Sequence, residues 1–105
     1  MLRVYEVILE LVRRVAPVIE RIGERDPDLA RQMRRSLASV PLNCAEGSHG
    51  KGKLRSLRYH NAAGSMRETM AGFDTAVAFG YIAPLDSETI AMCRQIVGTL
   101  VRCMR

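Results

Sequence analysis

The first two dozen residues constrain the fold most, because their apolar side chains recur at helical spacing along two adjoining lines. One line advances in steps of three and four residues and comprises Tyr5, Ile8, Val12, Val15, Ile19 and Ile22. The second line repeats every seven residues and comprises Val4, Leu11 and Val18. This spacing is typical of an α-helix, and so wide a stripe covers more than one neighbouring helix. We therefore predict a helix over residues 3–24, bent locally at Pro17, within a helical bundle.

A second helical segment begins at a strong capping signal. Asp26 can cap a helix and Pro27 suits its first position, so we expect a helix from Pro27 toward Glu46. Pro41 lies inside this segment, and the sequence leaves open whether it kinks the helix or ends it. The glycine-rich residues 47–52 are predicted to form a flexible loop that closes the helix.

Residues 53–79 predict a long third helix with two stripes on opposite sides. The more apolar stripe comprises Tyr59, Ala63, Met66, Met70, Phe73 and Val77. The mixed stripe comprises Leu54, Leu57, Asn61, Gly64, Glu68, Thr75 and Phe79. Two packed faces favour a helix held between neighbours, with Gly64 and Gly72 allowing close approach. Asp86 is expected to cap a fourth helix, with Leu85 and Ile90 at staple positions.

Together these signals predict an all-α protein, an antiparallel up-down-up-down four-helix bundle in one domain of residues 1–105. Only 5% of the residues are aromatic, so the core is expected to be aliphatic. The three cysteines have no CxxC spacing, which argues against a disulfide framework or a zinc site. No targeting signal and no membrane-spanning stretch stands out, so we expect a cytoplasmic protein.

The positive charge is concentrated in the middle of the chain. Eight basic residues lie between positions 31 and 67: Arg31, Arg34, Arg35, Lys51, Lys53, Arg55, Arg58 and Arg67. Glu46 is the one acidic residue between these positions. The rest of the chain contains eight basic and ten acidic residues. The middle segment therefore carries +7 and the remainder −2, within a net charge of +5. This asymmetry points to an anionic partner or to an acidic surface on another subunit.

Several short motifs together resemble a known family. The run from Ser39 to Ser48, Ser-Val-Pro-Leu-Asn-Cys-Ala-Glu-Gly-Ser, resembles the signature of the four-helix bundle proteins that include those encoded by 23S ribosomal RNA intervening sequences. Ala62–Glu68 and Gly80–Ile82 are similar to two further elements of that family. The motif residues that we single out are Pro41, Asn43, Glu46, Gly47, Gly64, Ser65 and Glu68.

The resemblance implies a four-helix protomer that assembles with copies of itself into a homopentameric barrel. The family is also similar to the accessory proteins of diversity-generating retroelements, which bind RNA and reverse transcriptase. Asn43, Glu46, Ser65 and Glu68 have two interpretations: they form a site, or they cap and bridge helices near Pro41. The sequence favours the second interpretation.

No catalytic site stands out. Residues 47–53 match the GxxxxGK part of a phosphate-binding loop, but Leu54 stands where a Ser or Thr would reach magnesium, and no strand precedes the loop. His49 and His60 have no Cys, Asp or Glu at metal-ligand spacing. We therefore expect no enzyme activity, no metal and no cofactor.

Two functions remain open. The basic side chains of Arg31, Arg34, Arg35, Lys51, Lys53, Arg55 and Arg58 are candidates for binding RNA or DNA, with phosphate contacts and little base readout. Alternatively, the chain is a scaffold that binds another protein, such as a nucleic-acid enzyme, and the basic face is merely solvated or pairs with a neighbouring subunit.

Overall fold

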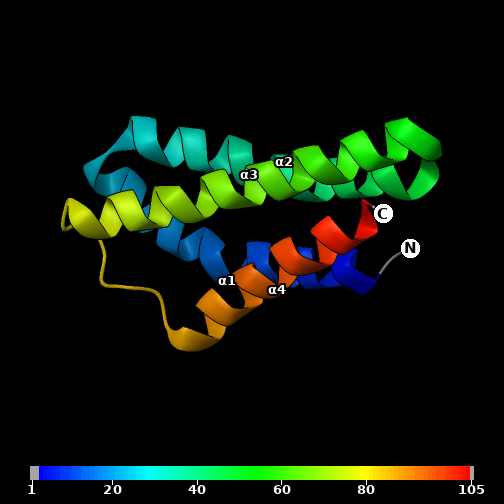
Figure 1. Ribbon diagram of the computed structural model, residues 1–105. Coiled ribbons are helices and arrows are strands. Elements are labelled where there is room, and N and C mark those ends of the chain that lie inside the picture. The colour runs from blue at the N-terminus through cyan, green and yellow to red at the C-terminus, as the bar shows by residue number, and fades with distance from the viewer. Residues whose placement is uncertain (1–2, 105) are drawn as a thin grey trace.

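The computed structural model describes residues 3–104, which form four α-helices and no strand. Their bounds are α1 (Arg3–Arg25), α2 (Pro27–His49), α3 (Gly52–Ala78) and α4 (Ser87–Cys103). In Figure 1, α2 and α3 lie side by side above α1 and α4, and each helix packs on two others. The start of α1 and the end of α4 lie at the same end of the molecule as the α2–α3 turn. The all-α prediction is confirmed; residues 1, 2 and 105 of the expected domain lie outside the described range.

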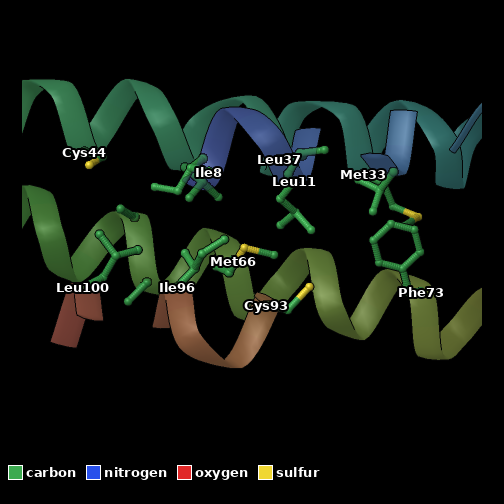
Figure 2. Packing of buried hydrophobic residues seen from close by; sticks show 14 of the residues in the cluster. Ile8, Leu11, Met33, Leu37, Cys44, Met66, Phe73, Cys93, Ile96 and Leu100 are labelled. Carbon is green, nitrogen blue, oxygen red and sulfur yellow. The ribbon is translucent and has the colours of Figure 1, made fainter. Parts of the chain in front are cut away.

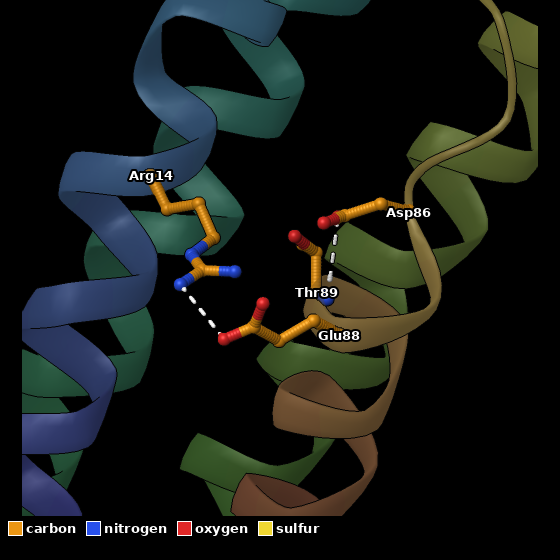
Figure 3. Close-up of polar contacts among 4 residues, drawn as sticks. All are labelled: Arg14, Asp86, Glu88 and Thr89. Carbon is orange, nitrogen blue, oxygen red and sulfur yellow. Dashed lines mark hydrogen bonds and ion pairs between the residues drawn. The ribbon is translucent and has the colours of Figure 1, made fainter.

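The two predicted helix caps are present. The Asp26 Oδ1 atom accepts a hydrogen bond of 3.0 Å from the backbone N–H of Leu29, and Pro27 occupies the first position of α2. The Asp86 Oδ1 atom accepts one of 3.3 Å from the N–H of Thr89, as Figure 3 shows. Hydrogen bonding with Thr89 lowers the pKa of the Asp86 carboxyl group. These caps satisfy N–H groups that have no partner inside the helix, and so they fix where α2 and α4 begin.

The second helix is longer than its sequence suggests. It continues through Pro41 and Gly47 to His49, so the predicted loop over residues 47–52 is wrong, and only Gly50 and Lys51 separate α2 from α3. Packing explains the difference. A Cβ atom at position 47 would lie 3.0 Å from Cζ of the buried Tyr59 ring, so the ring packs directly on the glycine backbone. This contact holds the last turn of α2 against α3 and outweighs the helix-breaking tendency of glycine.

All four helices contribute to the core, and α1 supplies most of its large β-branched side chains. The buried side chains of α1 are Val4, Ile8, Leu11, Val15, Ile19 and Ile22. Tyr5, Val12 and Val18 are partly buried around them. Figure 2 shows Ile8 and Leu11 packed among side chains from the other three helices, including Met66 and Ile96. The wide apolar stripe of α1 is therefore used inside the protomer, between α2 and α4.

The two stripes of α3 differ in how deeply they are buried. The more apolar stripe enters the core, where Tyr59, Ala63, Met66 and Phe73 are buried. The opposite stripe is not packed within the chain: Gly64 is exposed, and a Cβ atom there would meet nothing within 4 Å. Gly72 does make its predicted close approach, since a Cβ atom there would lie 2.7 Å from Cγ of Met33. The expected close approach at Gly64 is therefore wrong for the protomer.

The contact between α1 and α4 includes one ion pair. The Arg14 Nη2 atom lies 3.4 Å from Oε1 of Glu88, in the first turn of α4 (Figure 3). The Glu88 side chain is 73% exposed, so water screens this pair strongly. None of the helices within residues 3–104 carries an apolar stretch long enough to cross a bilayer.

Candidate nucleic-acid interface

Most of the basic side chains in the middle segment face solvent without a counter-charge. Arg34, Arg35, Lys51 and Lys53 are exposed, and within residues 3–104 none of them forms an ion pair. Arg31 does, because its Nη2 atom lies 2.9 Å from Oδ1 of Asp28. The α2–α3 hairpin therefore presents positive charge that the described part of the chain does not neutralise.

Because α2 is continuous from Pro27 to His49, these residues fall into two groups. Arg35 and Lys51 are separated by sixteen positions, and a helix rises about 1.5 Å per residue, which puts the two groups about 24 Å apart. Arg31, Arg34 and Arg35 lie near the α1–α2 turn. Lys51 and Lys53 lie at the other end of the hairpin. The structure thus does not gather the seven candidate residues into one patch.

Two of the candidates also have contacts within the fold. The Arg55 guanidinium lies 4.9 Å from the centre of the Tyr59 ring and donates a hydrogen bond of 3.3 Å to the carbonyl oxygen of Gly47. Arg58 donates a long bond of 3.5 Å to Oδ1 of Asn43. Burial raises the pKa of Tyr59, and Arg55 opposes that shift. Both arginines therefore help to hold α3 against α2, which leaves Lys51 and Lys53 as the freer cations at this end.

Hydroxyl and amide side chains join α2 to α3 along their shared seam. Ser36 and Thr69 are buried and their hydroxyl oxygens are 2.8 Å apart, as are those of Ser39 and Ser65. The Asn43 Nδ2 atom donates to Oγ of Ser39 at 2.9 Å. The α2 residue with the higher number, Ser39, pairs with the α3 residue with the lower number, Ser65, so the two helices are antiparallel. Ser65 thus bridges the two helices, while Asn43 bonds to Ser39 within α2 and accepts the long bond from Arg58 of α3.

The other motif residues are placed differently. Glu46 and Glu68 are exposed and form no ion pair with the described residues, while Pro41 is half-buried inside α2. Glu68 lines a shallow polar groove on the outer side of the hairpin, together with Arg35, Ser39 and Ser65. The sequence analysis did not single out Ser36 and Thr69. Each is a hydroxyl residue next to the apolar face of its helix, and that position could have indicated a hydrogen bond between α2 and α3.

The structure does not bring the two histidines together. His49 and His60 are both exposed and lie at separate points of the hairpin. No group of three His, Cys, Asp or Glu side chains within residues 3–104 is placed to hold a metal ion. Cys44, Cys93 and Cys103 are free thiols, and burial, followed by the nearby Cys103, raises the pKa of Cys44 to about 11. A thiol with that pKa is protonated at neutral pH and is a poor nucleophile.

These features define a class: a small four-helix protein whose α2–α3 hairpin exposes positive charge. The family model described as 23S rRNA-intervening sequence protein matches residues 1–102. The chain belongs to this family, and the match confirms the resemblance seen in the Ser39–Ser48 motif. Comparison with curated proteins gave no match, and neither did comparison with solved structures.

Proposed function

We propose that this chain is a non-enzymatic, homo-oligomeric protein that binds RNA or DNA through the exposed basic side chains of the α2–α3 hairpin. The observation that carries the proposal is the lack of neutralising partners. Of the basic residues from Arg31 to Arg67, only Arg31 forms an ion pair with the described part of the chain. Exposed cations of this kind are suited to phosphate contacts with little sequence preference.

Self-assembly is the second part of the proposal. Leu54 and Leu57 on α3 are 56% and 51% exposed, Leu42 on α2 is 65% exposed, and the backbone at Gly64 is open. Burying such side chains against copies of the chain would remove apolar surface from water. The proposed assembly is a ring of up-down-up-down protomers, pentameric as the family resemblance implies, in the cytoplasm. A ring repeats each basic group, so that weak contacts add up to useful affinity.

The test is binding of a labelled RNA as a function of salt. We expect the affinity of the wild-type protein to fall steeply as salt rises, because phosphate binding releases counterions. The double charge reversal Arg34→Glu and Arg35→Glu should weaken binding at least tenfold, with the oligomer mass unchanged by light scattering. Arg94→Glu with Arg102→Glu on α4 is the matched control, since it changes the net charge equally. Equal losses in both double variants would show that net charge alone, and not the hairpin, governs binding.

A second candidate function rests on the same exposed leucines. Leu54 and Leu57 would then contact another protein, such as a nucleic-acid enzyme of the reverse transcriptase kind, and the chain would act as a scaffold. Retention of a partner at high salt distinguishes the two functions, because apolar contacts survive salt whereas phosphate contacts weaken.

A further inference from the structure

An exposed aromatic side chain ends α3. Phe79 is 65% exposed and stacks on Tyr81, with ring centroids 5.3 Å apart and planes inclined by 11°. Leu54 and Leu57 belong to the first turns of α3, about 33 Å or more away at 1.5 Å per residue. Phe79 therefore lies at the far end of the mixed stripe of α3, well away from Leu54 and Leu57.

The backbone fixes this ring pair in place. The N–H of Tyr81 donates to the carbonyl oxygen of Ala76, and the N–H of Gly80 donates to that of Val77, both at 2.9 Å. Gly80 has a φ of 78°, which a residue with a side chain rarely adopts. This pattern of bonds is the Schellman motif of helix C-termini. It turns the chain sharply after Phe79 and holds both rings on one short rigid segment.

Side-chain contacts hold Tyr81 as well. Its hydroxyl group donates a hydrogen bond of 3.1 Å to Oδ2 of Asp26, whose other oxygen caps α2. The Arg25 guanidinium lies 5.6 Å from the centre of the Tyr81 ring. Burial, and then the bond to Asp26, raises the pKa of Tyr81. These contacts order Tyr81 before any ligand binds, and the stacked Tyr81 ring in turn restrains Phe79. A ligand that stacks on Phe79 would therefore lose little affinity to the ordering of these side chains.

Arginines and acids both lie around the ring pair. Arg21 and Asp86 line the cleft beside Tyr81, and Arg34 reaches back to within 3.6 Å of the Cβ position at Gly23 near the end of α1. Among the acids of this end, Asp26 accepts bonds from Tyr81 and Leu29, Asp28 pairs with Arg31, and Asp86 caps α4. Glu20, Glu24 and Asp74 are exposed and remain as opposing charges. An open aromatic face beside arginines is the combination that unpaired bases and their phosphates favour.

We infer that Phe79 is a stacking platform for a base of single-stranded nucleic acid, with Arg21, Arg25 and Arg34 contacting the adjoining phosphates. The inference rests on the proposed function and narrows its ligand to single strands. Bases of a duplex are stacked on one another and cannot cover the ring without unpairing. Single-strand binders commonly use aromatic residues in this way, and the contact tolerates any base.

The experiment compares a fluorescein-labelled 12-nucleotide RNA with a 12-base-pair duplex, using the full chain at fixed salt. Phe79→Ala should weaken binding of the single strand about fivefold or more, the range seen when one stacking residue is removed. Binding of the duplex should stay within twofold, and Phe79→Trp should restore the single-strand affinity. Phe79→Leu is the matched control, because it keeps an apolar side chain at this position and removes the aromatic face. It should bind the single strand as weakly as Phe79→Ala.

The outcomes separate this inference from the proposed function. One outcome is that the wild-type protein binds RNA in a salt-dependent way and Phe79→Ala binds the single strand as tightly as wild type. That outcome would overturn the stacking role of Phe79 but not the proposed function. A reduced oligomer mass in Phe79→Ala would overturn the stacking role too, since Phe79 would then contact a second copy. No binding of either RNA by the wild-type protein would overturn both proposals.

Discussion

The two helix pairs of the bundle are held together in different ways. Between α2 and α3, buried hydroxyl groups pair across the seam and Gly72 lets Met33 approach the helix backbone. Between α1 and α4, the polar contact is the solvent-exposed pair Arg14–Glu88. A shallow cleft also lies between these two helices, lined by Val4, Val7, Gln95, Ile96 and neighbouring residues.

This difference suggests a division of roles. Directional hydrogen bonds and glycine contacts specify one register, because a shift of either helix would break several of them together. Apolar contacts and exposed charges are less directional, so α4 is anchored to α1 mainly by the area that it buries. We expect the α2–α3 hairpin to be the rigid part that carries the basic groups. Four measurements would break or sharpen this comparison.

The largest effect is expected for Gly72→Ala. The new Cβ atom would lie 2.7 Å from Cγ of the buried Met33, so the Met33 side chain or the backbones of α2 and α3 must shift, at a cost of about 3 kcal/mol. Gly64→Ala is the control: it meets no atom of the chain within 4 Å, and it should stabilise the fold by up to about 1 kcal/mol through helix propensity. Urea denaturation measures both. If Gly64→Ala instead dissociates the oligomer, a second copy covers this face of α3.

A pH effect of about 2 kcal/mol is expected from Cys44 on α2. Burial raises its pKa from 9.0 to about 11, so between these values the folded state holds a proton that the unfolded state has lost. Stability is therefore unaffected well below pH 9 and falls above it. The slope approaches about 1.4 kcal/mol per pH unit between the two pKa values, and the loss amounts to about 2 kcal/mol at pH 11. Denaturation curves from pH 8 to pH 11 should show a shallower decline in Cys44→Ala. An identical decline would mean that other groups cause the loss.

Thr69→Val should cost about 1 kcal/mol. The substitution keeps the shape of the side chain but removes its hydrogen bonds to Ser36 and to the Ser65 carbonyl oxygen. Thr75→Val is the matched control on the same helix, because Thr75 is exposed and its hydroxyl bonds only to Ala71 of its own helix. Thermal unfolding should separate the two variants. If they behave alike, the seam bond contributes nothing beyond the bond within α3.

Arg14→Met should cost only about 0.3 kcal/mol, because an exposed ion pair gains little in water. The loss should disappear in 1 M salt, where charges are screened within about 3 Å. Denaturation at low and high salt measures the difference. A loss above 1 kcal/mol that persists in salt would show that Arg14 holds α4 through packing of its side-chain stem.

Much of the fold is predictable from local signals. Asp26 and Asp86 sit where their capping chemistry is needed, and the spacing of the α1 residues identifies the core. The end of α2 was not predictable, because Gly47 reads as a helix terminator until Tyr59, twelve positions later, packs on it. Periodicity also identified two stripes on α3 but could not tell which would find a partner within the chain.

The site was less predictable than the fold. Positive charge in the middle segment is evident from composition, but its division into two ends depends on α2 continuing through Pro41. The Phe79–Tyr81 stack had a sequence signal, an aromatic residue on each side of Gly80 directly after a helix. Its neighbour Arg25 belongs to α1, far away in sequence, so only the folded chain brings them together.

The position of the chain ends has a practical consequence. Both α1 and α4 have their outer ends beside the α2–α3 turn (Figure 1), and a 2.9 Å hydrogen bond from Ser56 to the Met104 carbonyl oxygen anchors the second of them. A tag or fused reporter at either end would therefore extend from the end of the bundle that carries the α2–α3 turn and leave Phe79 unobstructed. Tethering the protein to a sensor surface through such a tag presents the aromatic end to an oligonucleotide in the flow.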